Sequence, residues 1–353
     1  MFERQISLSV ATLLWVVGIF LSLVLLWQLK SLLVVLMIAV VIASTLAPII
    51  NRAEKWGIPR WLGVILAYLG LILLLTGAGL VIGPKLITQI ERLWQKLPAY
   101  WEILGNLAEA LVVRFGVREP ETIALINQFF DVQGLTGWAF RSSEVLIVRS
   151  VAVTRGVLGV AFNFFLALLL SGYMLAGSRN LIEGLVSLFP EPWEDRLEAQ
   201  VGPVSDRMGG YIQGRIVVSG ILGIVITFGL GIIGIAEFSL ALGVIAGFTN
   251  LIPFFGPVLG AIPALLVAIA QGGWTFFWVL LLYLVVQNVE TYVLDPLLVG
   301  SSVRVSPLYQ LLAVLGGVQL LGIIGALIVP PWVAGAAVLL ENLYLEPKKA
   351  KIT

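Results

Sequence analysis

Residues 250 to 264 read NLIPFFGPVLGAIPA, and they interrupt the apolar block 238–271 with three prolines and two glycines. Proline removes a backbone donor, and glycine permits bends and close approach. In hydrocarbon every backbone N–H and C=O needs a partner, so a broken backbone persists only where it is buried in protein or faces water. The stretch therefore predicts a broken helix that builds a solute or ion site. The alternative is an ordinary proline kink.

The composition places this block in a polytopic membrane protein. The chain has 353 residues, of which 59% are hydrophobic and 12% are charged, and its mean hydropathy is +1.04. Soluble domains carry about 25% charged residues. Runs long enough to cross about 30 Å of hydrocarbon recur along the chain. They predict an all-α polytopic fold of about eight membrane segments, namely 6–27, 31–50, 61–83, 151–175, 216–235 and 273–292 with two longer blocks at 238–271 and 308–343.

Several classes of chemistry are excluded by missing residue types. The chain has no cysteine and no histidine, so disulfides, thiolate metal sites and imidazole proton relays are ruled out. No G-x-x-x-x-G-K-[ST] phosphate loop is present, so the chain alone cannot be an ATP-driven pump. We expect no enzymatic activity, cofactor, metal or nucleic-acid partner. The expected partners are the lipid bilayer, a small polar solute or cation, and further copies of the chain.

The distribution of positive charge predicts the orientation, because Lys and Arg concentrate in cytoplasmic loops. With the N-terminus inside, the short outer loop after the first span carries only Lys30. Both termini are therefore expected to be cytoplasmic. The residues assigned to the inner side are Arg4, Arg52, Lys55, Arg60, Arg179, Arg196, Arg207, Arg215, Lys348, Lys349 and Lys351.

A polar segment, 84–150, separates the third and fourth predicted spans. Its apolar residues are spaced four and three apart, as in a coiled-coil seam or a helix lying on a surface. The seam either packs on its own bundle and the lipid headgroups or forms a subunit contact, and Pro98 is expected to break or kink it. A second amphipathic stretch, Trp193–Gln213, is interpreted as an interfacial helix. The seam consists of Leu86, Ile90, Leu93, Leu97, Tyr100, Leu104, Leu107 and Leu111.

The two long blocks share a sequence pattern. Residues 247–256 and 316–325 both read G-x-x-[NQ]-L-[IL]-x-x-x-G at a constant offset of 69. A single helix of such a block would measure about 50 Å, well over the hydrocarbon core. We therefore favour re-entrant hairpins with tips at 250–256 and 319–325, which would form an inverted repeat of the kind found in secondary transporters. Kinked full spans are the alternative.

Ionisable residues at membrane depth are expensive and usually mark pathways. Glu290 ends a polar cluster in which Gln287 shares its helix face. Asp295 and Arg304 flank a connector with proline and glycine breakers, and they either pair with each other or contact a ligand or cation.

These observations predict a solute pathway. Asn250 and Gln319 are expected to face each other across it, with Gln287 and Glu290 completing the wall. Alternating access would come from movement of 215–343 against the first four spans. The expected pathway residues are Asn250, Pro253, Gly256, Pro257, Gln287, Glu290, Asp295, Arg304 and Gln319. The expected units are a three-span scaffold 1–83, the extramembrane segment 84–150, the fourth span with its amphipathic helix 151–214, the transport unit 215–343 and a basic tail 344–353.

Three motifs resemble one known family over essentially the whole chain. They are N-L-I-P-x-x-G-P at 250–257, Q-x-x-E-x-x-x-L-x-P from Gln287 to Pro296, and the glycine-rich stretch from Gly316 to Gly325. Together they resemble the autoinducer-2 exporter family. The resemblance implies a bacterial inner-membrane permease of about eight spans that exports a small polar solute of the autoinducer-2 type without ATP.

The resemblance also leaves an alternative, because some members are associated with sodium/proton antiport. Many members have a histidine where this chain has Ser306. An imidazole cannot couple protons at this position, which leaves Glu290 and Asp295 as the candidate titrating groups.

Overall fold

The computed structural model describes residues 28–115, 150–299 and 306–350, with isolated positions at 17, 18, 21, 24, 25 and 128. The predicted first span 6–27 lies almost entirely outside this part of the chain, as does Arg304. Every regular element in the described ranges is helical, as the composition predicted. The elements are α2 (Lys30–Lys55), α3 (Arg60–Arg114), α6 (Ser150–Ala176), α7 (Ser178–Val186), α8 (Trp193–Ile233), α9 (Ser239–Thr249), α10 (Phe255–Gln271), α11 (Thr275–Val289), the π-helix η1 (Glu290–Val299), α12 (Pro307–Leu340), the π-helix η2 (Glu341–Leu345) and α13 (Glu346–Ala350).

Helix lengths and composition agree with a multi-pass membrane protein. Five helices of the described chain are long and apolar enough to cross a membrane. A sixth is counted if α7 and the preceding residues 161–176 form one span, although they are bent by 84°. The count treats 307–348 as one helix, but Gly322 divides it into two, as described below.

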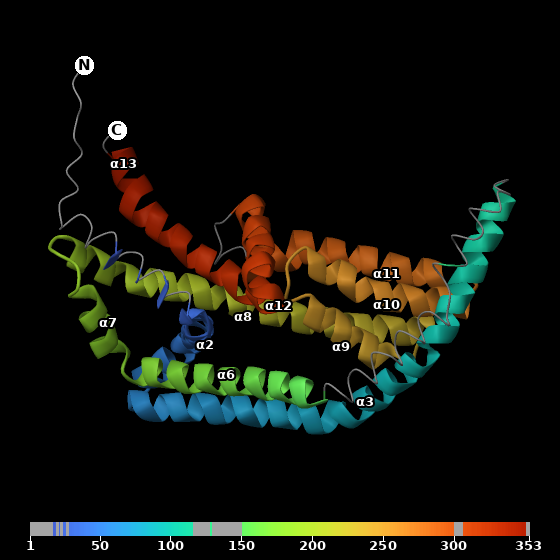
Figure 1. The fold of residues 1–353 in the computed structure, drawn as a ribbon, viewed down its shortest axis with the longest axis horizontal. Coiled ribbons are helices and arrows are strands. Elements are labelled where there is room, and N and C mark those ends of the chain that lie inside the picture. The colour runs from blue at the N-terminus through green and yellow to red at the C-terminus, as the bar shows by residue number, and fades with distance from the viewer. Residues whose placement is uncertain are drawn as a thin grey trace, which may run out of the picture.

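The first three described spans pack into one group, which we call the scaffold. It consists of α2, the first part of α3, and α6, and these three helices contact one another. In Figure 1 the first part of α3 lies beside α6 along one edge of the molecule. At the end of the group, Arg60 Nε donates to the backbone oxygen of Leu175 at 2.8 Å. Glu54 bridges Arg60 and Arg179, with both N–O distances at 2.8 Å.

Helix α3 is longer than predicted. The expected third span and the amphipathic seam form one helix of 55 residues that contains Pro84 and Pro98. Pro98 was expected to break or kink the helix, and it does not break it, because α3 continues through this residue. Figure 1 shows α3 leaving α6 and turning past α9 and α10. We call residues 85–114 the arm.

Helix α8 also runs across a predicted boundary. The amphipathic stretch and the fifth span form one helix of 41 residues, about 60 Å long. Two glycines let it touch other backbones. A Cβ at Gly209 would collide with the backbone of Ser44 in α2, and a Cβ at Gly214 would collide with the Leu298 carbonyl in η1. This close packing carries Arg215, the next residue, into the protein interior.

The stretch 250–264 builds a helical hairpin, as predicted. Helix α9 ends at Thr249, α10 begins at Phe255, and Phe254 has a φ of 66°. Glycine lets the two helices approach closely, because a Cβ at Gly256 would collide with Thr249 and one at Gly260 with Ala246. The alternative of a merely kinked span is therefore wrong for this block.

The second long block is also a hairpin. Gly322 interrupts α12 with a φ of 66° and a ψ of −152°. The helical halves on either side touch through Gly317 and Gly325, and a Cβ on either glycine would collide with the backbone of the other. At the offset of 69, Gly322 aligns with Pro253, one residue from Phe254. The two breaks thus fall at nearly equivalent positions, which supports the internal repeat.

Candidate functional site

A buried arginine lies at the centre of the described polar contacts. The Arg215 side chain is 5% exposed, and its Nη1 donates to Glu290 Oε1 at 3.1 Å and to Asp295 Oδ1 at 3.3 Å. One interpretation of the sequence paired Asp295 with Arg304. In the structure Asp295 is paired with Arg215, and Arg304 lies outside the described residues. One guanidinium therefore holds both carboxylates that the sequence proposed as pathway groups.

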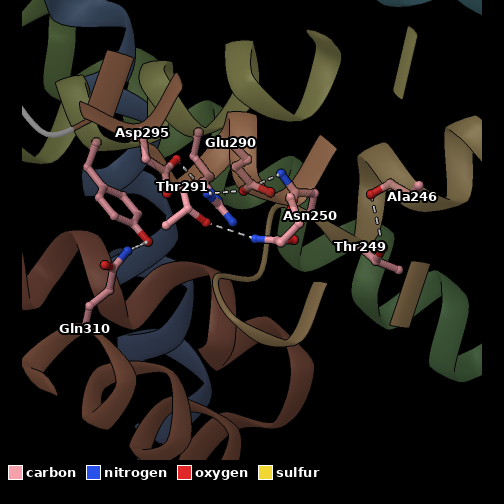
Figure 2. Close-up of polar contacts among 10 residues, drawn as sticks. Ala246, Thr249, Asn250, Glu290, Thr291, Asp295 and Gln310 are labelled. Carbon is pink, nitrogen blue, oxygen red and sulfur yellow. Dashed lines mark hydrogen bonds and ion pairs between the residues drawn. The ribbon is translucent and has the colours of Figure 1, made fainter. Parts of the chain in front are cut away.

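The tip of the first hairpin joins the same network. Asn250 Nδ2 donates to Glu290 Oε1 at 3.0 Å, and Figure 2 shows the two side chains pointing toward each other. Asn250 is 1% exposed and Glu290 is 2% exposed. Glu290 Oε1 thus accepts from two elements that are far apart in sequence. The network ties the broken backbone at 250–254 to α8 and η1.

The π-helical turn explains how Glu290 and Asp295 reach one guanidinium. In an α-helix, residues five apart lie about 140° apart around the axis. The i→i+5 hydrogen bonding of a π-helix brings such residues close to one face, and π segments are frequent at functional sites. Residues 290–299 were expected to include part of a connector, but they form η1 with Pro296 inside it. The sequence offered no signal for this geometry.

Three buried polar atoms beside the network have no hydrogen-bond partner among the residues described. They are Arg215 Nε, Ser219 Oγ and Asn250 Oδ1. Arg215 and Ser219 are one turn apart on α8, and the Ser219 backbone lies against Gly247 of α9. Natural proteins rarely leave such groups unpaired, so each one calls for a ligand, a water or a functional reason.

A small cavity adjoins the network. Its volume is about 20 Å³, which is enough for a water molecule but not for a sugar-sized solute. In this conformation the site is closed. The lining residues are Leu222, Ile226, Ala246, Asn250, Pro257, Tyr283, Val286, Gln287 and Glu290.

Four of the remaining pathway candidates lie in the first hairpin turn or beside the small cavity. Pro253 and Gly256 are buried in the hairpin turn, while Pro257 and Gln287 line the small cavity. Gln287 Nε2 also donates to Thr291 Oγ1 at 3.3 Å.

Gln319 is not part of this arrangement. Its side chain is exposed, it does not line the cavity, and α12 packs chiefly against α8. The expected pairing of Asn250 with Gln319 is therefore not seen. A repeat places two residues at equivalent points of two hairpins, but it does not determine what each hairpin packs against.

Sequence reasoning missed the role of Arg215. It stands at the start of a long apolar run and was assigned to the cytoplasmic side by the charge rule. The signal that could have identified it is the adjacent glycines, Gly209 and Gly214, since small residues mark close helix packing in membranes. A buried arginine in such a segment needs a carboxylate partner, and Glu290 and Asp295 were available.

A larger cavity approaches the network from the end where α7 and the first turns of α8 lie. It is open to the outside, has a volume of about 500 Å³ and is lined mainly by α2, α6, α7 and α8. Its lining reaches Met208, which is two helical turns from Arg215 on the same face of α8. The walls are mainly apolar, with Ser44, Asn51 and Asp206 among the polar groups.

Comparison with known proteins extends over nearly the whole chain. A family model described as "AI-2E family transporter" matches residues 12–345. The chain is 28% identical over 327 residues to "Putative transport protein YrrI" of Bacillus subtilis, covering 89% of both chains. It is 27% identical over 323 residues to "Putative transport protein MT0215" of Mycobacterium tuberculosis, covering 88% of this chain and 83% of that one. The chain therefore belongs to the AI-2E family of membrane transporters.

Proposed function

We propose that this protein is a secondary transporter that exports a small polar solute of the autoinducer-2 type by alternating access, without ATP. The observation that carries the proposal is the network of the buried residues Arg215, Asn250 and Glu290 with the partly exposed Asp295, at the broken tip of the first hairpin. Broken helices near membrane depth commonly build transport sites. Membership of the family supports a transport function, and the network supports the proposed position of the solute site.

The free polar atoms match a hydroxyl-bearing solute. Arg215 Nε is a donor, Asn250 Oδ1 is an acceptor, and Ser219 Oγ can serve as either. Each hydroxyl of a solute also donates and accepts, so adjacent hydroxyls can satisfy all three atoms. Rearrangement must first widen the cavity of about 20 Å³.

The arrangement favours a neutral polar solute over a cation. Glu290 and Asp295 already share the Arg215 guanidinium. A sodium ion between them would be repelled by that positive charge at close range in a medium of low dielectric constant. The antiport alternative thus finds no specific support in the network.

The 500 Å³ cavity provides the proposed entry route. It opens from the end that carries Arg52, Lys55, Arg60 and Arg179, and clustered cations mark the cytoplasmic side. The location proposed is the bacterial inner membrane, with both termini in the cytoplasm. The structure then corresponds to a state with an inner vestibule and a closed site.

The test of this function is counterflow of labelled autoinducer-2 in proteoliposomes. Asn250→Ala removes the Nδ2 donor to Glu290 and the unpaired Oδ1, so affinity should fall roughly five- to a hundred-fold, corresponding to about 1 to 3 kcal/mol. Gln319→Ala, an exposed amide in the second hairpin, should transport at the wild-type rate.

Wild-type counterflow in Asn250→Ala would contradict this site assignment. Accumulation that depends on an imposed sodium or pH gradient, with no counterflow of autoinducer-2, would instead favour the antiporter. Equal loss in both alanine variants would show that the two hairpins contribute alike.

We also propose that a second copy of the chain covers the outer face of the arm. Leu93 is buried within this chain, but Ile90, Trp94, Leu107 and Leu111 are 43%, 66%, 43% and 53% exposed. Leu107→Lys combined with Leu111→Lys should therefore lower the subunit number measured by native mass spectrometry. Trp56→Lys, which alters an apolar side chain that is 83% exposed at the α2–α3 turn, serves as the control. An unchanged mass in the arm variant would leave headgroup contact as the role of this face.

A further inference from the structure

Helix α3 joins the scaffold to the first hairpin through two different parts of its length, beside α8, which also packs against both α2 and α9. It packs against α2 and α6, and it also packs against α9 and α10. The contacts with the hairpin come from the arm, as Gln89 and Lys96 show below. One continuous helix thus spans two groups of elements.

Gln89 makes the buried contact between the arm and the hairpin. It is 6% exposed, and its Oε1 accepts a hydrogen bond from the Ala241 backbone N–H at 2.8 Å. The first amides of a helix lack partners within that helix. In α9 the N-cap position is Phe238, whose side chain cannot accept a hydrogen bond, and Leu242 is the first amide bonded back to Phe238 O. Gln89 therefore caps α9 from another helix.

Lys96, two turns further along the arm, contacts the residues just before the start of α9. Its Nζ donates to both carboxylate oxygens of Glu237, at 3.0 and 2.8 Å. It also lies 5.1 Å from the ring centroid of Phe238, which is completely buried. An exposed ion pair alone contributes little. Combined with the buried Gln89 contact, it fixes the residues at which α9 begins.

The stretch of α3 between the scaffold and the arm has the composition of a joint. Residues 76–84 read TGAGLVIGP, and a Cβ at Gly77, Gly79 or Gly83 would meet nothing within 4 Å in the part of the chain that the structure describes. Packing among the described residues thus does not require these glycines, and each one weakens the helix relative to alanine. Pro84 removes a further helix hydrogen bond. Sharp helix bends occur at such sites.

From these contacts we propose that the arm and the α9–α10 hairpin form one body, positioned by Gln89 and Lys96, and that α3 bends at residues 77–84 between this body and the scaffold. Gln89 is a positioning residue, because capping α9 fixes the helix that ends at Asn250. The moving unit then includes the arm as well as residues from 215 onward. The proposal rests on the proposed function only in treating the hairpin as a moving part.

The cap is tested by hydrogen–deuterium exchange, which requires no solute. Gln89→Met keeps the length and removes the acceptor, so the amides at 239–243 should exchange about ten-fold faster, because a buried donor loses its partner. Gln89→Glu keeps an acceptor at a helix N-terminus, where negative charge is favourable, and should restore slow exchange. Equal exchange in wild type and Gln89→Met would overturn the cap. Fast exchange in both variants would show that an acceptor at position 89 does not protect these amides, which would also overturn the cap.

The joint is tested by distance measurements between paired nitroxides. The chain has no cysteine, so cysteines introduced at exposed sites carry the only labels. The pair Trp94→Cys with Val258→Cys reports the arm against the hairpin, and Trp94→Cys with Tyr173→Cys reports the arm against the scaffold. We expect the first distance distribution to be narrow and the second to be broader. The opposite order, or equal widths, would show that the arm belongs to the scaffold.

Discussion

Arg215→Met is expected to abolish transport and to lower the stability of the protein by about 3 to 5 kcal/mol, because it leaves a buried carboxylate without its partner. Glu290 is 2% exposed, so its charge cannot be solvated where it lies. Thermal unfolding in detergent, followed through the fluorescence of the 11 tryptophans, measures the loss. Counterflow in proteoliposomes measures the activity.

A charge-balanced double variant separates stability from function. Arg215→Met with Glu290→Gln removes the buried charge and leaves Asp295, whose side chain is 40% exposed and reaches water. We expect the double variant to recover most of the lost thermal stability while transport remains absent. A double variant that transports at the wild-type rate would show that the network is structural only. Wild-type melting of Arg215→Met would show that the buried ion pair does not form.

Gly317→Ala is expected to disrupt the second hairpin, whereas the same change at the preceding residue is expected to be tolerated. A Cβ at Gly317 would collide with the backbone of Gly325, but one at Gly316 would meet none of the described residues within 4 Å. Overpacking of this kind typically costs about 1 to 3 kcal/mol, and more where backbone must move. Gly316→Ala instead gains helix propensity of up to about 1 kcal/mol.

The two alanine variants can be compared by thermal unfolding and by counterflow. Gly317→Ala should melt at a lower temperature and transport more slowly, and Gly316→Ala should match or exceed the wild-type melting temperature. The same unfolding temperature in both variants would contradict the close contact of the two halves of α12.

The first hairpin could be predicted from sequence because Pro253 and Gly256 act on the backbone at their own positions. The second was predicted from the length of its block and from the pattern that it shares with the first block at an offset of 69. The spans could likewise be predicted because hydropathy depends on composition alone. The continuity of α3 through Pro84 and Pro98 could not be predicted from sequence. Proline weakens a helix locally, and contacts with distant elements such as α9 decide whether the helix continues.

The candidate site was predicted only in part, because side-chain partners depend on tertiary packing. The sequence singled out Asn250 and Glu290 as polar groups at membrane depth, and in the structure both are buried and share a hydrogen bond. Arg215 was assigned to the cytoplasmic side, because its burial follows from glycine contacts that no single segment reveals. The convergence of Glu290 and Asp295 required a π-helical turn. Gln319 was included because the repeat places it at the position equivalent to Asn250. A repeat of this kind does not determine which residues surround the equivalent position.

The turn of the first hairpin has a consequence for how the protein is made. Its backbone groups are bonded within the turn, with Leu251 N–H to Phe248 O, Ile252 N–H to Thr249 O and Gly256 N–H to Ile252 O. Helix α9 has 11 residues and α10 has 17, and neither reaches the about 20 residues needed to cross the bilayer alone. The insertion machinery should therefore release α9 and α10 into lipid together, as one preformed hairpin. The hydrogen bonds of its turn should form before Arg215 pairs with Glu290.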